Sequence, residues 1–238
     1  MKSTIKKIIK LSPIPLSRNH LYDIQTKKII KTLNKNSNCI DIGCFIGEIL
    51  DLLLKQAPEG QHFGIEPIPE KFNELKKKYA KLDNCHILNY AASNRKGESD
   101  FNFVVSNPSY SGLKKRDYDN PNEEDTTITV KTELLDNLIP EDLHIDFMKI
   151  DVEGAELQVL QGASRIIEKC KPIIVFEHGL GASDIYGTSP EMIFNYFQEK
   201  FMRISNLGSW LKDSPALSVE NFCDQYYNKR NYYFIAHP

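Results

Sequence analysis

The chain has 238 residues, of which 41% are hydrophobic, and this is enough apolar material for the core of one large α/β domain. Its 30 basic and 32 acidic residues leave a formal charge of −2, so no overall field would hold a polyanion, which argues against nucleic acid as a partner. The five cysteines show no CxxC spacing. The sequence therefore predicts neither a disulfide framework nor a zinc knuckle, and reduced thiols favour a cytoplasmic location.

Residues 1–35 are predicted to form a helical lead, followed by a single domain over residues 36–238. Lysines interrupt residues 1–10, so we expect no secretory signal and no transmembrane segment there. A solvated terminus is favoured, and a short basic helix that touches a membrane or a partner is the alternative. Residues 23–34 have helical periodicity with Ile29, Ile30 and Leu33 turned inward, before a short apolar strand that has Asp41 at its carboxyl end.

The turn after this strand carries Asp41, Gly43 and Gly47 ahead of a second helix. Glycine permits a sharp turn and the close approach of a ligand, and a helix start presents unpaired N–H groups. Asp41 supplies a negative charge that suits an ammonium group better than a phosphate. Glu66 ends the next strand, 25 residues later, where a carboxylate can accept both hydroxyls of a ribose. Either acid alone could be an ordinary loop residue, but together they favour a nucleoside cofactor with a cationic amino-acid end.

Strands and helices continue to alternate, which indicates a parallel sheet. We expect further strands at residues 86–90, 145–150 and 173–176, and a helix over residues 155–169. Two earlier helices, one after Gly47 and one over residues 69–82, have apolar stripes. The stripes consist of Ile49, Leu50, Leu53 and Leu54 in the first, and of Phe72, Leu75, Tyr79 and Leu82 in the second.

About fifty residues separate the third and fourth strands. We expect one strand in them, at residues 127–132, and a loop insertion at residues 106–126 that is either solvated or a substrate lid. Near the end of the chain, Ser189 and Pro190 predict the start of a helix, and residues 203–207 and 232–236 read as two late strands. The helix should bury Met192, Ile193, Tyr196 and Phe197.

Five segments resemble, in order, the FkbM family of S-adenosylmethionine-dependent O-methyltransferases. They are DIGCFIG at 41–47, GIEPIPE at 64–70, LNYAAS at 88–93, DFMKIDVEGAE at 146–156 and PIIVFEH at 172–178. Cys44 and Phe45 depart from the small and polar residues usual in the family. The resemblance implies a Rossmann-like class I methyltransferase fold, with a seven-stranded, mostly parallel α/β sheet that ends in a C-terminal antiparallel hairpin.

The resemblance also implies S-adenosylmethionine as the cofactor. Glu66 would then hold the ribose, and Asp41, Gly43 and Gly47 would shape the methionine end. Asp151 would lie near the cofactor. The adenine would be lined by residues 89–92, of which the candidates are Asn89, Ala91 and Ala92.

The ends of the fourth and fifth strands bring ionisable residues together. Lys149 and Asp151 share one side of a strand, so Lys149 is expected to pair with a carboxylate, with catalysis as its alternative role. His178 has the pKa best suited to a general base at neutral pH, and with Asp151 it is expected to border the transferred methyl group. In a less favoured alternative, Asp151, Glu153 and Glu177 bind Mg²⁺, which lowers the pKa of the acceptor hydroxyl.

The family resemblance suggests an acceptor hydroxyl on a sugar, a polysaccharide precursor or another secondary metabolite. We expect it to bind under residues 106–125, where Asn107, Ser109, Tyr110 and Ser111 offer hydrogen bonds and an aromatic face. Two other functions compete. A nucleotide-dependent dehydrogenase would prefer a GxGxxG turn where this chain has GxxxG, and a methyltransferase-like subunit could bind without turnover.

Overall fold

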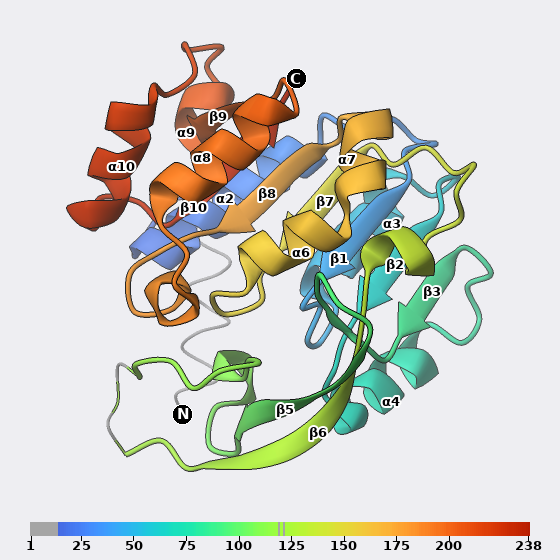
Figure 1. The fold of residues 1–238 in the computed structure, drawn as a ribbon. Coiled ribbons are helices and arrows are strands. Elements are labelled where there is room, and N and C mark those ends of the chain that lie inside the picture. Colours follow the sequence, from blue (N-terminus) through green and yellow to red (C-terminus); the bar gives the residue numbers. More distant parts are fainter. Residues whose placement is uncertain (1–13, 119, 121) are drawn as a thin grey trace.

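The computed structural model describes residues 14–118, 120 and 122–238, and the basic segment at residues 1–10 lies outside them. A seven-stranded sheet forms the centre, in the order β3-β2-β1-β7-β8-β10-β9 (Figure 1). Neighbouring strands run parallel, except that β10 is antiparallel to both β8 and β9. The strands are β1 (Cys39–Ile42), β2 (His62–Ile65), β3 (Cys85–Leu88), β7 (Phe147–Ile150), β8 (Ile173–Glu177), β9 (Arg203–Asn206) and β10 (Tyr233–His237). The expected fold class, including the terminal antiparallel strands, is confirmed.

Helices cover both faces of this sheet (Figure 1). One face packs on α2 (Arg18–Ile30), α3 (Glu48–Gln56) and α9 (Leu207–Trp210), and the other packs on α6 (Glu156–Gly162), α7 (Ser164–Cys170), α8 (Pro190–Glu199) and α10 (Val219–Tyr227). Successive strand residues point to opposite faces of the sheet. Phe147 and Val175 therefore pack on the face covered by α2, α3 and α9, and Met148 and Phe176 pack on the face covered by α6, α7, α8 and α10. This alternation later decides which strand-end residues reach the site.

Most of the expected helices form, but some buried stripes are shorter than expected. Ser189 accepts a hydrogen bond from Met192 N at 3.4 Å and starts α8, as expected. Met192 itself is 46% exposed, so its place in the stripe was wrong. The helix α4 (Pro69–Lys78) ends before Leu82. Leu82 therefore lies outside the expected stripe and is 42% exposed.

The single helix expected over residues 155–169 is two helices, α6 and α7, with a break at Ala163. Asp136, on the short α5 (Leu135–Leu138), accepts hydrogen bonds from Arg165 N at 2.7 Å and Ile166 N at 3.1 Å. These are N–H groups that a continuous helix would bond to its own carbonyls. A side chain from a distant segment therefore stabilises the break.

The long connection contains a second sheet, in the order β4-β6-β5, which lies beside the main one (Figure 1). Its strands are β4 (Ala91–Ala92), β5 (Gly97–Val104) and β6 (Asp125–Glu133). The expected strand at 127–132 lies within β6, whereas β5 was not expected because its first half is polar. The segment between β5 and β6 passes through a short 3₁₀ helix, η1 (Pro108–Tyr110). Within the described part of the chain, no helix combines the length and the apolar character that crossing a bilayer needs.

Candidate active site

A cavity of about 830 Å³ opens where β1, β2, β7 and β8 end and β10 begins. This is the edge at which parallel α/β sheets bind ligands. Seven of its lining residues are acidic and four are basic, so the cavity favours a ligand that carries positive charge. The acids are Asp23, Asp41, Glu48, Glu66, Asp151, Glu153 and Glu177, and the bases are Arg18, Arg116, Lys149 and Lys229.

The end of β1 presents Asp41 to this cavity, and the turn that follows contains Gly43. Gly43 has a φ of +77°, and a Cβ there would lie 2.0 Å from the Asp151 carbonyl oxygen, so only glycine lets this turn lie against the end of β7. Asp41 is 2% exposed, and its Oδ2 has no hydrogen-bond partner among the described residues. Burial raises the pKa of Asp41 to about 7, although Lys149 acts in the opposite direction. An unpaired buried carboxylate oxygen is costly, and a cationic ligand group would satisfy it.

Glu66 lies at the end of β2 and also lines the cavity. Its Oε2 accepts a hydrogen bond from Phe45 N at 2.8 Å, and its Oε1 accepts one from Ile68 N at 2.9 Å. Burial raises its pKa to about 7, against these two bonds. Each oxygen keeps a further lone pair, so the clamped carboxylate can still accept two hydroxyls.

The other expected cofactor residues divide into two groups. Ala91 and Ala92 are buried and line the cavity. Gly47 and Asn89 do not line the cavity that the described residues form. Asn89 instead donates hydrogen bonds to the carbonyl oxygens of Glu66 and Pro67, at 2.8 and 3.0 Å, and the Gly47 carbonyl accepts one from the Tyr79 hydroxyl at 2.9 Å. Asn89 therefore supports two residues of the cavity wall without lining the cavity itself.

Asp151 follows β7 and is the most densely bonded acid of the site. Its Oδ2 lies 2.7 Å from Lys149 Nζ and 2.5 Å from the Tyr233 hydroxyl, and the carboxylate is also hydrogen-bonded to Glu177. Burial opposes ionisation, but Lys149 and these hydrogen bonds hold its pKa at about 2. Burial and the Asp151 charge raise the pKa of Glu177 well above its usual value. The lowered pKa of Asp151 and the raised pKa of Glu177 favour a negative charge on Asp151, beside the cation of Lys149.

Lys149 pairs with a carboxylate, as expected, and the register of the sheet explains how. Asp41 is its neighbour on β1, and Tyr233 is the neighbour of Glu177 across the β8–β10 pair. All of these side chains line the cavity. Four strands, β1, β7, β8 and β10, therefore place one cation, one phenol and three acids, counting Asp151 directly after β7, on the same side of the sheet.

His178 is not part of this arrangement. It is 0% exposed, does not line the cavity formed by the described residues, and stacks on Phe222 and Tyr226 with ring centroids 5.9 and 4.7 Å apart. Neither ring nitrogen has a hydrogen-bond partner in the part of the chain described, and burial lowers its pKa to about 3. The expectation that His178 borders the methyl group disagrees with this position, because alternation along β8 sends Glu177 to the cavity and His178 to the opposite face.

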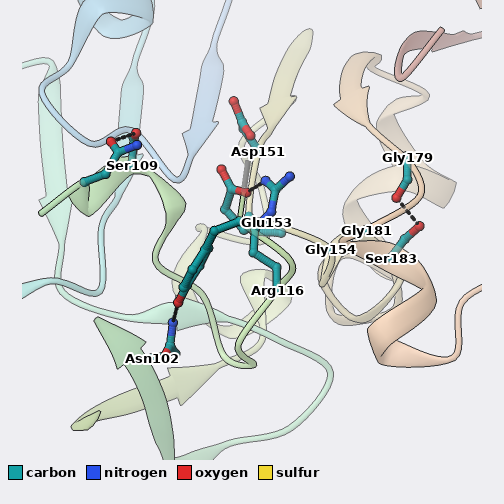
Figure 2. A network of polar contacts seen from close by, with 12 residues as sticks. Asn102, Ser109, Arg116, Asp151, Glu153, Gly154, Gly179, Gly181 and Ser183 are labelled. Atoms are coloured by element: carbon teal, nitrogen blue, oxygen red, sulfur yellow. Dashed lines mark hydrogen bonds and ion pairs between the residues drawn. The ribbon is translucent and has the colours of Figure 1, made fainter. Parts of the chain in front are cut away.

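Glu153 and Glu177 do converge with Asp151, as the metal alternative requires. One carboxylate oxygen from each of the three lies within 4.8 Å of the others. However, Glu153 forms an ion pair with Arg116, from the segment between β5 and β6 (Figure 2). The turn that carries Glu153 is held by Glu156 Oε1, which accepts hydrogen bonds from Val152 N at 3.3 Å and Gly154 N at 3.1 Å.

The β5–β6 segment contributes directly to the cavity wall, through Ser109, Tyr110, Ser111, Leu113 and Arg116. Tyr110 stacks on Tyr118 with ring centroids 6.4 Å apart, and the Arg116 guanidinium lies 5.1 Å from the centre of the Tyr110 ring. The segment is also bonded to the loop after β8, through Lys114 N and the Tyr186 hydroxyl at 2.8 Å.

Reasoning from the sequence missed Tyr233 and Arg116. Both act through contacts with segments far along the chain, and neither lies in a local motif. For Tyr233 a signal existed, because it begins a late strand whose pairing with β8 could be anticipated. Arg116 lay in a mixed charge run that gave no such signal.

A parallel sheet with this strand order, an acid-and-glycine turn after β1 and a second acid after β2 define a class I methyltransferase fold. The methyltransferase FkbM domain matches residues 41–204. The chain belongs to this family. This membership favours a methyltransferase over the dehydrogenase alternative.

Individual relatives are more distant. The chain is similar to the 2-O-methyltransferase NoeI of Sinorhizobium fredii, with 28% identity over 163 residues that cover 61% of this chain and 65% of NoeI. A crystal structure of a methyltransferase FkbM from Methylobacillus flagellatus is 20% identical, covers 61% of this chain and 33% of that one, and has a TM-score of 0.45. A SAM-dependent methyltransferase from Aquifex aeolicus is 14% identical, covers 100% and 96% of the two chains, and has a TM-score of 0.44.

Proposed function

We propose that this chain is an S-adenosylmethionine-dependent O-methyltransferase that acts on a hydroxyl group of a sugar or a related metabolite. The observation that carries the proposal is the buried Asp41 Oδ2, which has no hydrogen-bond partner among the described residues and lies in an acid-rich cavity at the strand ends where parallel α/β sheets bind ligands. A carboxylate there needs a cation, and the amino-acid end of S-adenosylmethionine has one.

The residues present fit this cofactor. Asp41 would accept the ammonium group, and Gly43 leaves room for the methionine end against β7. Glu66, already fixed by two backbone N–H groups, would accept the ribose hydroxyls, and Ala91 and Ala92 would lie against the adenine. When bound, the cofactor supplies a methyl group on a positively charged sulfur.

Asp151 would hold the acceptor. As an ionised carboxylate fixed by Lys149 and Tyr233, it can accept a hydrogen bond from the acceptor hydroxyl and align the oxygen. A hydroxyl oxygen becomes strongly acidic as it gains a methyl group, so a carboxylate of low pKa suffices to take the proton late in the transfer. His178 is not needed for this step.

The acceptor would bind beneath residues 106–118, where Tyr110 offers a ring face and Ser109 a hydroxyl. The name of NoeI, a 2-O-methyltransferase, supports an oxygen acceptor. We also propose that residues 36–238 act as one domain, with the β5–β6 segment as its acceptor-side insertion.

The test is a screen of hydroxyl acceptors with S-adenosylmethionine, read by mass spectrometry as the gain of one methyl group. Sugars, polysaccharide precursors, RNA and DNA would be compared at equal concentration. We expect methylation of a carbohydrate or related hydroxyl compound. Faster methylation of a nucleic acid would overturn the acceptor class. Cofactor binding without any turnover across the screen would support the non-catalytic alternative instead.

A further inference from the structure

The acidic cluster of Asp151, Glu153 and Glu177 has the composition of a divalent-cation site, since hard cations take several carboxylate oxygens. The three oxygens are within 4.8 Å of one another and belong to the ends of β7 and β8. Convergence of acids alone does not make a metal site. Whether the cluster can bind a cation depends on the partners that the three acids already have.

Each of the three acids already has an internal partner. Asp151 is paired with Lys149 at 2.7 Å, Glu177 is hydrogen-bonded to Asp151, and Glu153 forms an ion pair with Arg116. Figure 2 shows the Arg116 guanidinium directed at Glu153. Two side-chain cations, Lys149 and Arg116, therefore already pair with acids that a metal ion would need as ligands.

Arg116 is held in this position by its surroundings. Its side chain is 16% exposed and that of Glu153 is 12% exposed. The Tyr110 ring lies under the guanidinium, and Tyr110 in turn stacks on Tyr118. The Tyr118 hydroxyl is fixed by Asn102 at 2.5 Å and by Asp125 at 3.0 Å. A planar, permanently charged group in a packed environment keeps a defined direction.

The guanidinium also has donors to spare. One nitrogen, Nη1, bonds Glu153, whereas the buried Nε has no partner within residues 14–118, 120 and 122–238. Arg116 lines the cavity on the side of the β5–β6 segment. Its remaining N–H groups can therefore donate to oxygens of an acceptor beside Asp151.

We propose that Arg116 takes the place of a divalent cation in the acidic cluster, so that the β5–β6 segment supplies the acceptor-binding charge and no metal ion is required. Its effect on the acceptor rests on the proposed methyltransferase function. Its effect on metal binding does not, and the two can be measured separately.

The first experiment measures Mn²⁺ binding to the full chain by electron paramagnetic resonance. The variants are Arg116→Met and, as a control, Lys115→Met, which removes an equal charge from the next residue. Lys115 pairs with Asp125 and is 63% exposed. We expect Arg116→Met to bind Mn²⁺ at least roughly tenfold more tightly than the wild type, because a nearby positive charge is gone. Lys115→Met should behave as the wild type, and adding Glu153→Gln to Arg116→Met should abolish the gain.

Equal Mn²⁺ binding by the wild type and Arg116→Met, at a site that Glu153→Gln removes, would overturn the proposal. So would the absence of any gain in Arg116→Met when circular dichroism shows it to be folded. If Arg116→Met does not fold, Arg116→Lys decides the question. It should still exclude Mn²⁺, and tight Mn²⁺ binding by a folded Arg116→Lys would contradict us.

The second experiment uses an acceptor identified in the methylation screen. Wild-type turnover should be unchanged by EDTA, and Arg116→Met should raise the acceptor KM at least roughly tenfold while the Kd for S-adenosylhomocysteine stays within about twofold. Loss of wild-type activity in EDTA, restored by Mg²⁺, would refute the inference while leaving the methyltransferase proposal intact. A chain that methylates nothing would instead count against the proposed function, and the Mn²⁺ result would still decide the role of Arg116.

Discussion

The two halves of the cavity are built in different ways. The half with Asp41 and Glu66 comes from two consecutive strand ends and is fixed by backbone contacts, including the close approach of Gly43 to β7 and the N–H bonds to Glu66. The half around Asp151 is assembled from β7, β8, β10 and the β5–β6 segment, through side-chain contacts such as Tyr233–Asp151 and Arg116–Glu153.

This difference separates two tasks. A cofactor that is the same for every member of a family can be bound by a rigid local turn. An acceptor that differs between members needs a surface whose residues can change independently, and loops on a fixed scaffold provide it. Substitutions in the first half should therefore alter cofactor affinity, and substitutions in the second should alter turnover or acceptor binding.

The largest effect is expected for Asp151→Asn. The amide cannot take the acceptor proton and pairs poorly with Lys149, so we expect kcat to fall by about 10²- to 10⁴-fold. The Kd for S-adenosylhomocysteine, measured by titration calorimetry, should change far less. A variant that loses cofactor affinity and turnover equally would erase the distinction between the two halves.

Tyr233→Phe should lower kcat by roughly tenfold, because it removes one hydrogen bond to a charged carboxylate. Asp151 would then ionise less readily, and the acid limb of the pH–rate profile should move to higher pH. Tyr232→Phe is the matched control, since its hydroxyl bonds Asn19 rather than Asp151. Identical pH–rate profiles for Tyr233→Phe and the wild type would contradict the claim that Tyr233 stabilises the ionised form of Asp151.

Cofactor affinity should depend on pH through Asp41 and Glu66. Their pKa values are raised to about 7, so each is protonated below that pH and must ionise to bind a cation or to act as a full acceptor. We expect the affinity for S-adenosylhomocysteine to rise between pH 6 and pH 8, by roughly tenfold for each group that must ionise. Asp41→Asn should remove one of these contributions, and an unchanged slope in that variant would contradict the assignment.

The stability of the ligand-free protein should change with the opposite sign. A carboxyl group whose pKa is higher in the folded state contributes stability at low pH that is lost as the pH rises through the folded pKa. Asp41→Asn should therefore lessen the decline in Tm toward pH 8.

The smallest effect is expected for His178→Phe. The phenyl ring can keep the stacking on Phe222 and Tyr226 and leaves no buried nitrogen unpaired. We expect kcat to stay within about twofold, whereas loss of a general base typically costs about 10²-fold or more. A loss of that size in a variant with an unchanged Tm would restore the base hypothesis.

The half with Asp41 and Glu66 could be anticipated from the sequence because its signals are local. Apolar runs marked β1 and β2, and the positions of Asp41, Gly43 and Glu66 relative to those runs indicated the cavity wall. The expected fold class followed from the same alternation and from the family segments.

The half around Asp151 could be anticipated only in part. Asp151, Glu153 and Glu177 were expected to converge, and they do. His178 was misplaced because adjacent strand residues face opposite ways, a rule that was available from the sequence. Arg116 could not be assigned, since its role depends on how a distant segment folds against β7. Tyr233 could have been found only by pairing its late strand with β8. The polar start of β5 likewise becomes a strand only through its pairing with β6.

The most direct test of the account is titration calorimetry of S-adenosylhomocysteine and of NAD into the wild type and Glu66→Ala. We predict a single site for S-adenosylhomocysteine, weakened in Glu66→Ala by about 2 to 3 kcal/mol, the scale of hydrogen bonds to a charged group, and no comparable binding of NAD. Unchanged affinity in Glu66→Ala, or tight binding of NAD by the wild type, would contradict the central claim that this cavity binds a methyl-donor cofactor.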